Sequence, residues 1–213
     1  MIALVDYGAG NLTSVRKALS ALGAEFMTPE RPPEVKGARA VIVPGVGHFA
    51  ATSALDEEWR EAIGGAARAG TPLFGICVGM QWLFEGSDEA PGVPGLGVMA
   101  GRIHRLAGDA EARLKVPHVG WNALDFTRPA RILAGLPSGA QVYFTHSFAA
   151  PVTDTCVAST THANTFASVV ERDNVFGVQF HPEKSSDAGL RILRNFLDLV
   201  GPRATGDGPQ GNG

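Results

Sequence analysis

The sequence predicts an α/β protein whose open, mostly parallel sheet is flanked by helices, with antiparallel strands added in the second half. In the first half, short continuous apolar runs alternate with helix-like runs, which is the pattern of parallel strands covered on both faces. After residue 97, β-branched and aromatic runs follow one another with turns between them and little helical periodicity, as in antiparallel sheets. The length, 213 residues, suits one domain, since a domain takes ~100–200 residues.

The elements of the first half follow from their apolar spacing. In the first predicted helix, Val15, Leu19 and Leu22 share one face, and Gly23 follows as a stop signal. In order, we expect strand Met1–Val5, helix Leu12–Leu22, strand Ala40–Val43, helix Leu55–Ala69 and strand Pro72–Ile76.

The second half is predicted to hold six strands and a closing helix. That helix covers Asp187–Val200, with Ser186 as its cap and one apolar face made of Leu190, Leu193, Leu197 and Val200. We expect one domain over residues 1–200 and a disordered Gly/Pro-rich tail over residues 201–213. The predicted antiparallel strands are Val98–Leu106, Val116–Asn122, Val142–Phe148, Thr155–Ser159, Phe166–Val170 and Val175–Phe180.

Composition and charge exclude several classes of function. The net charge is −3 and no long run of one sign occurs, so we expect no nucleic-acid partner. The longest uncharged apolar stretch, Thr71–Phe84, is too short for the ~20 residues that span a bilayer, so no membrane association is expected. The spacing of cysteines and histidines matches no zinc signature, and Cys77 and Cys156 form no disulfide framework. These features favour a cytoplasmic protein without a metal or cofactor.

The segment Gly75-Ile76-Cys77-Val78-Gly79 carries the strongest chemical signal. It follows an apolar strand and precedes the helix-like run Val78–Phe84. Glycines two residues before and after a nucleophile are typical of a tight strand–turn–helix elbow. At the start of a helix, Cys77 would be favoured as a thiolate, and the Val78 amide could donate to an oxyanion. The alternative is a buried structural cysteine among packing glycines.

A second segment, His181-Pro182-Glu183, ends the last predicted strand. Residues two apart in an extended chain point to the same side, so Glu183 can reach one ring nitrogen while the other faces a thiol. This is the arrangement of base and orienting acid in nucleophilic catalysis. Taken alone, the tripeptide would be better explained as a surface turn; the cysteine elbow and its place at a strand end favour the catalytic interpretation.

The Gly-rich segment Pro44-Gly45-Val46-Gly47-His48 follows another parallel strand. Ligands bind at the carboxyl ends of strands in open α/β sheets, and Gly45 and Gly47 allow the backbone to approach a ligand closely. The peptide between the two glycines can rotate at small steric cost, so its N–H could turn toward the site when a partner binds. His48 and His146 could line the same site. The alternative is an ordinary Gly-rich turn.

These motifs together resemble a known family. The cysteine segment, extended to Gln81, and Gln179–Glu183 resemble the class I glutamine amidotransferases, whose fold is flavodoxin-like. Five finer motifs resemble the glutaminase subunits of imidazole glycerol phosphate synthase, although Phe148 stands where that family usually has tyrosine. The five motifs are Asp6–Leu12, Pro44–Phe49, Lys115–Asn122, Tyr143–Phe148 and His181–Ser185.

The resemblance implies a role for each matching residue. Cys77 would attack glutamine, His181 would move the protons and Glu183 would hold the histidine ring. Val78 together with Val46 and Gly47 would form the oxyanion hole. The substrate contacts would come from Gly45, Gln81, Glu89, His146, Ser147 and Phe148.

The resemblance also implies a partner. Ammonia would pass to a (β/α)₈-barrel cyclase subunit in a heterodimer, which forms imidazole glycerol phosphate and aminoimidazole carboxamide ribotide in histidine biosynthesis. Asn11, Trp121, Tyr143 and Lys184 would lie near that interface. Three alternatives stay open: the glutaminase subunit of an anthranilate or aminodeoxychorismate type enzyme, a stand-alone γ-glutamyl cysteine hydrolase, and a binding module without catalysis.

Overall fold

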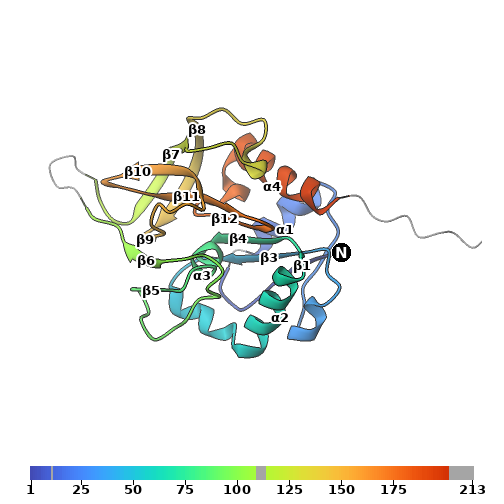
Figure 1. The fold of residues 1–213 in the computed structure, drawn as a ribbon. Helices are drawn as coiled ribbons and strands as arrows, with labels where there is room; N and C mark the ends of the chain where they lie inside the picture. The colour runs from blue at the N-terminus through green and yellow to red at the C-terminus, as the bar shows by residue number, and fades with distance from the viewer. Residues whose placement is uncertain (11, 109–113, 202–213) are drawn as a thin grey trace, which may run out of the picture.

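A mixed nine-stranded sheet forms the centre of the part of the chain that the computed structural model describes, residues 1–10, 12–108 and 114–201 (Figure 1). Half of the sheet is parallel and half antiparallel. The parallel strands are, in spatial order, β2 (Phe26–Met27), β1 (Ile2–Leu4), β3 (Ala40–Gly45), β4 (Leu73–Cys77) and β12 (Val175–Val178). The antiparallel strands continue as β11 (Asn164–Arg172), β10 (Cys156–His162), β7 (His118–Phe126) and β8 (Ala140–His146). A small separate sheet contains β5 (Gly86–Ser87), β6 (Arg102–Arg105) and β9 (Phe148–Ala149).

The parallel strands follow the order 2-1-3-4-5 of flavodoxin-like sheets, with β12 in the fifth place. The predicted fold class is therefore confirmed, but one strand assignment is wrong. The run Val175–Phe180 was expected to be antiparallel, whereas β12 pairs in parallel with β4, with Val178 opposite Ile76. All four residues of β12 are buried, as in β3 and β4, because helices cover both faces of the sheet at this position.

Helices cover both faces of the parallel strands (Figure 1). The helices α1 (Leu12–Ala21) and α4 (Ser186–Val200) pack on one face, and α2 (Glu57–Arg68) and α3 (Val78–Trp82) pack on the other. Alternate residues of β4 feed the two cores, since Phe74 packs with the α4 side and Leu73 with the α2 side. Helix α2 begins two residues later than predicted because the Asp56 side chain accepts the Trp59 amide and caps it.

Helix α4 differs from its prediction in which face is buried. The core face contains Ile192, Leu193 and Phe196, whereas Leu190 is 36% exposed. Phe196 decides the rotation, because its ring stacks on Phe74 with the ring centres 4.9 Å apart. The residue before the helix is Ser185 rather than the expected Ser186, and its hydroxyl is used elsewhere. The short edge strand β2 carries no recognisable pattern in two residues and was not predicted.

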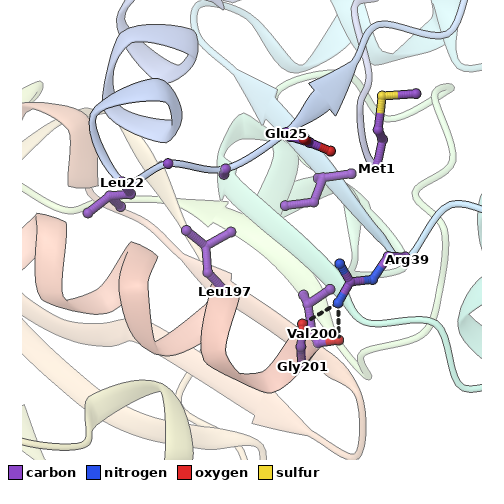
Figure 2. A pocket seen from close by; sticks show the side chains of 10 residues that line it. Met1, Leu22, Glu25, Arg39, Leu197, Val200 and Gly201 are labelled. Atoms are coloured by element: carbon purple, nitrogen blue, oxygen red, sulfur yellow. Dashed lines mark hydrogen bonds between the residues drawn. The ribbon is translucent and has the colours of Figure 1, made fainter. Parts of the chain in front are cut away.

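A cavity of about 310 Å³ lies beside the amino end of β1, between α1 and the end of α4 (Figure 2). Leu22, Leu197 and Val200 supply its apolar lining. The Arg39 guanidinium donates to the carbonyls of Val200 and Gly201, so it closes the carboxyl end of α4. The cavity is therefore at the opposite end of the strands from the motifs of the sequence analysis. The predicted tail beyond Gly201 lies outside the described residues. No helix in the described ranges has the length and apolar character needed to cross a bilayer.

Candidate active site

Cys77 occupies a strained turn between β4 and α3. Its backbone has φ 53° and ψ −111°, a left-handed region that a residue with a side chain rarely adopts. Helix α3 starts at the next residue, so the free amides of its first turn point toward the space around the sulfur. The structure thus contains the elbow that the glycine spacing predicts.

The glycines on either side make this turn possible. A Cβ atom on Gly79 would lie 1.8 Å from the Val43 carbonyl oxygen, and one on Gly75 would lie 2.6 Å from the Gly79 carbonyl oxygen. Both obstacles are backbone atoms, which cannot move aside without displacing β3 or α3. Glycine is therefore required at both positions for β3, β4 and α3 to pack this closely.

His181 and Glu183 lie at the same edge of the sheet as Cys77, because β12 and β4 are parallel neighbours. His181 Nδ1 is 2.9 Å from Glu183 Oε1, and both side chains are buried. Burial lowers the pKa of His181, but its interactions with the Cys77 thiol and the Glu183 carboxylate outweigh burial and raise that pKa to about 10. An imidazolium facing a cysteine is the arrangement that favours a thiolate.

The backbone that carries His181 and Glu183 differs from the predicted extended conformation. We expected His181 and Glu183 to point to one side of an extended chain, whereas Pro182–Lys184 form a short 3₁₀ helix. This turn curls Glu183 back under the ring of His181. Gly189 allows α4 to pack closely against this 3₁₀ turn, because a Cβ atom on Gly189 would lie 2.0 Å from the Pro182 carbonyl oxygen.

The backbone of His181 is fixed to β8 through Ser185. The His181 amide donates to the Tyr143 carbonyl at 3.0 Å. The buried Ser185 hydroxyl accepts the Tyr143 amide at 2.9 Å and donates to the His181 carbonyl at 2.7 Å. Two hydrogen-bonded routes therefore link the histidine to the strand that carries Tyr143.

Replacing Ser185 with alanine should reduce both stability and turnover. The change leaves the Tyr143 N–H without a partner in a buried place, which costs about 1–3 kcal/mol of unfolding free energy. The His181 carbonyl loses one of its two donors and keeps the Lys184 amide at 3.0 Å. Ser138→Ala is the control for turnover, because its hydroxyl also joins two backbone groups, of Phe126 and Leu124, at an exposed place away from the site. Chemical denaturation and glutaminase kcat measure the two effects. A kcat for Ser185→Ala no lower than that of Ser138→Ala would contradict the positioning role.

A pocket of about 250 Å³ opens above the cysteine sulfur. It contains most of the site residues inferred from the sequence and adds Pro117 and Thr145. Its lining consists of Val46, Gly47, Cys77, Val78, Gln81, Glu89, Pro117, Thr145, His146, Ser147 and Phe148. His181 and Glu183 lie buried behind this lining rather than in it.

The two glycines of the Gly-rich turn have different surroundings. Gly45 ends β3 opposite Cys77 and does not line the pocket; a Cβ on it would lie 2.2 Å from the Tyr7 hydroxyl. Gly47 has φ 89° and open space around it. His48, expected as a possible pocket residue, is exposed and caps the following 3₁₀ helix by accepting the Ala50 amide. The turn is therefore fixed at Gly45 and unobstructed at Gly47.

Two of the expected substrate contacts, Glu89 and Gln81, have hydrogen-bond partners inside the protein. Glu89 accepts the Phe49 amide at 2.8 Å and so ties the end of the Gly-rich turn to the pocket wall. Gln81 donates from Nε2 to the Phe148 carbonyl at 2.9 Å and to Gln179 Oε1 at 3.1 Å. Both amide hydrogens of Gln81 are thus used, so its carbonyl oxygen is the atom it can offer to a ligand.

His146 belongs to a chain of hydrogen bonds that runs from β7 to the pocket. Its Nδ1 is 2.9 Å from the Phe148 carbonyl, and its Nε2 is 3.0 Å from His118 Nδ1. Asn122 donates to His118 Nε2 at 3.3 Å. Burial lowers the pKa of His146 to about 3 and that of His118 to about 4, so both rings are neutral at pH 7. Each ring therefore donates from Nδ1 and accepts at Nε2.

The residues expected at a partner interface are gathered around the edge strand β8. Trp121 and Tyr143 are cross-strand neighbours, with ring centres 6.1 Å apart. Trp121 is 52% exposed, and Lys184 is also exposed. Asn11 lies outside the described residues.

One residue at the nucleophile was not assigned a role from the sequence. The fully buried Gln179 places Nε2 3.7 Å from Cys77 Sγ. The signal was available: Gln179 precedes His181 by two residues, and alternate residues of an extended chain face the same side. Phe180 between them is buried in the core on the α4 side of the sheet.

The sheet has the flavodoxin-like strand order, a cysteine elbow after β4, and a buried His–Glu pair after the neighbouring parallel strand β12. This combination defines a class of cysteine-dependent amidotransferases. In agreement, the family description "Glutamine amidotransferase class-I" matches residues 3–200. A solved glutamine amidotransferase superposes with a TM-score of 0.73 at 22% identity, covering 94% of this chain and 99% of its own. The chain belongs to the class I glutamine amidotransferase family.

Similar proteins of known name indicate which member of the family this chain resembles. The chain is 46% identical to imidazole glycerol phosphate synthase subunit HisH of Moorella thermoacetica, covering 93% of this chain and 95% of the relative. It is 45% identical to subunit HisH of Thermococcus kodakarensis, covering 93% of this chain and all of the relative. These similarities confirm the resemblance to the glutaminase subunits of this synthase.

Proposed function

We propose that this chain hydrolyses glutamine to glutamate and ammonia and supplies the ammonia to a cyclase subunit that forms imidazole glycerol phosphate. The observation that carries the chemistry is the grouping of Cys77, His181 and Glu183 beneath one pocket. The identity to HisH subunits carries the choice of pathway and partner.

The reaction takes place in two halves. Cys77 Sγ attacks the side-chain carboxamide carbon, and the tetrahedral intermediate collapses when His181 gives a proton to the departing ammonia. The C–N bond is thereby replaced by a C–S thioester. Water, deprotonated by His181, then attacks the thioester, releases glutamate and returns the sulfur to its starting state. Glu183 keeps the histidine ring oriented throughout, because it holds Nδ1.

The oxyanion of each intermediate would be held by backbone amides. The Val78 N–H is at the start of α3, directly after the nucleophile. The second donor would come from the Val46–Gly47 turn, which lines the same pocket. Each donor can contribute about 3 kcal/mol to transition-state stabilisation. Since Gly45 is confined and Gly47 is not, rotation of this peptide would take place on the Gly47 side.

The amino-acid part of glutamine would be recognised by the polar wall of the pocket. The Gln81 carbonyl oxygen and the Glu89 carboxylate suit an α-ammonium group, because both accept hydrogen bonds. The backbone of His146–Phe148 forms the opposite wall. Phe148 lacks the hydroxyl of the tyrosine usual in the family, so only its backbone is available for a polar contact with substrate.

The surface around Trp121 would receive the cyclase, a (β/α)₈ barrel, in a heterodimer. Val119 and Trp121 are more than half exposed and lie two residues apart on β7, so they share a face. Large exposed apolar side chains of this kind are typical of interfaces. Lys184, which directly follows Glu183 in the chain, adds a positive charge to this surface. A cytoplasmic location is part of the proposal and agrees with two free, buried cysteines.

Glutaminase activity should depend on the partner. If the Gly47 side of the turn rotates only when the cyclase and its ligand are bound, glutamine hydrolysis should rise at least tenfold on their addition, since one oxyanion donor is worth about 10²–10³ in rate. Ammonia release from the isolated chain, the complex and the ligand-bound complex measures this. Equal rates of ammonia release from the isolated chain, the complex and the ligand-bound complex would contradict the proposed rotation of the peptide. No hydrolysis in any of the three samples would contradict the proposed activity itself.

A further inference from the structure

We propose that the Gln179 amide is a built-in hydrogen-bond donor to the nucleophilic sulfur and that Gln81 is the residue that aims it. The inference rests on the proposed function for its biological meaning, but its geometry does not depend on the substrate. It assigns Gln81 a second role, separate from binding a ligand.

The orientation of Gln179 follows from the bonding of its neighbour. Gln81 Nε2 carries only hydrogens, so its 3.1 Å contact must be to the carbonyl oxygen of Gln179. The NH₂ group of Gln179 is then forced to the other side, where it lies 3.7 Å from Cys77 Sγ. A reversed Gln179 amide would set two NH₂ groups against each other and leave the sulfur facing an oxygen.

Gln81 is itself held in place. Its other amide hydrogen goes to the Phe148 carbonyl, which also accepts His146 Nδ1. His146 is fixed by His118, so the Phe148 carbonyl has two donors in a defined geometry. Gln81 therefore has one orientation open to it, and it passes that orientation on to Gln179.

Burial separates this arrangement from substrate recognition. Gln179 has no exposed surface and is absent from the pocket lining, so its side chain acts through the two groups that it contacts, Cys77 Sγ and the Gln81 amide. A hydrogen bond from a neutral donor is stronger to an anionic acceptor than to a neutral one. The Gln179 N–H consequently favours the thiolate over the thiol, and it assists release of the sulfur when the thioester is cleaved.

The test measures the reactivity of Cys77 without any substrate. Alkylation by iodoacetamide is followed across pH by mass spectrometry in a Cys156→Ala background, because Cys156 is the other cysteine. Burial raises the pKa of Cys156 to about 11, so it would react slowly in any case. Two variants, Gln179→Met and Gln179→Glu, remove the donor at similar volume, and the glutamate still accepts from Gln81.

Both Gln179 variants should alkylate about three- to tenfold more slowly at pH 7, with pH profiles moved to higher pH. Gln81→Met should move the profile in the same direction, although Gln81 has no contact with the sulfur. The double variant Gln81→Met/Gln179→Met should equal Gln179→Met alone, since both changes remove one interaction. Asn195→Leu is the control: it removes a buried amide of α4 that donates to the backbone carbonyls of Ile132 and Ala134, and its profile should be unchanged.

Each contrary outcome has a definite meaning. Unchanged profiles in both Gln179 variants would overturn the donor role. If the methionine variant does not fold, an unchanged profile in the glutamate variant alone overturns it, because the added carboxylate charge would itself move the profile to higher pH. A shift in the Gln179 variants with none in Gln81→Met would overturn the aiming role. Failure of the proposed function is distinguishable, because it would appear as absent glutaminase activity in the unchanged protein with its cyclase, whatever the alkylation profiles show.

Discussion

Cys77→Ser is expected to abolish glutamine-dependent synthesis by the complex with its cyclase while leaving ammonia-dependent synthesis intact. The serine hydroxyl is a far weaker nucleophile than a thiolate in the same place, so glutamine hydrolysis should fall about 10⁴-fold or more. Ammonium salts bypass the thioester and enter at the cyclase. Formation of imidazole glycerol phosphate, measured with each nitrogen source in turn, separates the two routes.

Cys156→Ser provides the matched control for this experiment. Cys156 is also buried and free, but its sulfur lies 3.3 Å from the Ala158 carbonyl oxygen in β10 and takes no part in the site. Its replacement should leave both nitrogen sources usable. If Cys77→Ser kept the glutamine-dependent reaction, the nucleophile would have to be sought elsewhere; if it lost both reactions, the change would have damaged the complex.

Gly79→Ala should damage the protein more than its single methyl group suggests. The added Cβ would lie 1.8 Å from the Val43 carbonyl oxygen, a backbone atom of a fully buried strand. Relief requires α3 to move away from β3, which would cost about 3 kcal/mol or more of unfolding free energy and would displace the Val78 amide. Gly75→Val should behave in the same way, because its Cβ meets backbone atoms of Gly79 and Met80 at 2.6–2.7 Å.

Gly65→Ala is the matched control, since Gly65 is a helical glycine in α2 with room for a methyl group. A Cβ there meets only the ends of Arg68 and Glu61, at 3.8 Å. This variant should gain about 0.5–1 kcal/mol of unfolding free energy and keep its activity. Urea denaturation and glutaminase kcat are the measurements. Native stability and activity in Gly79→Ala would show that the elbow tolerates a side chain.

Much of this site could be predicted because its chemistry is local in the sequence. The glycines around Cys77 and the His181–Glu183 pair each lie within five residues, so turn geometry and spacing were enough to find them. Of the pocket residues, Val46, Gly47, Cys77 and Val78 lie at the carboxyl ends of the parallel strands β3 and β4, which parallel packing brings to one edge. His146–Phe148 come from the antiparallel strands β8 and β9 and were found from the family resemblance.

What could not be predicted depends on pairing between distant strands. The direction of β12 is set by its neighbour β4, about 100 residues earlier in the chain, and an apolar run alone does not reveal it. The link from Gln81 to Gln179 and the bridge through Ser185 join residues from separate elements and need the folded arrangement. The buried face of α4 likewise depended on where Phe196 meets Phe74.

The late position of β12 has a consequence for biosynthesis. When the ribosome has synthesised the chain as far as residue 170, Cys77 is present but His181, its proposed base, and Gln179, its proposed hydrogen-bond donor, are not. The nucleophile is therefore assembled last, when the final parallel strand closes on β4 over a long loop, a contact of the kind that slows folding. In an incomplete chain, Cys77 would have the reactivity of an unactivated cysteine. It would become nucleophilic only when β12 has joined the sheet.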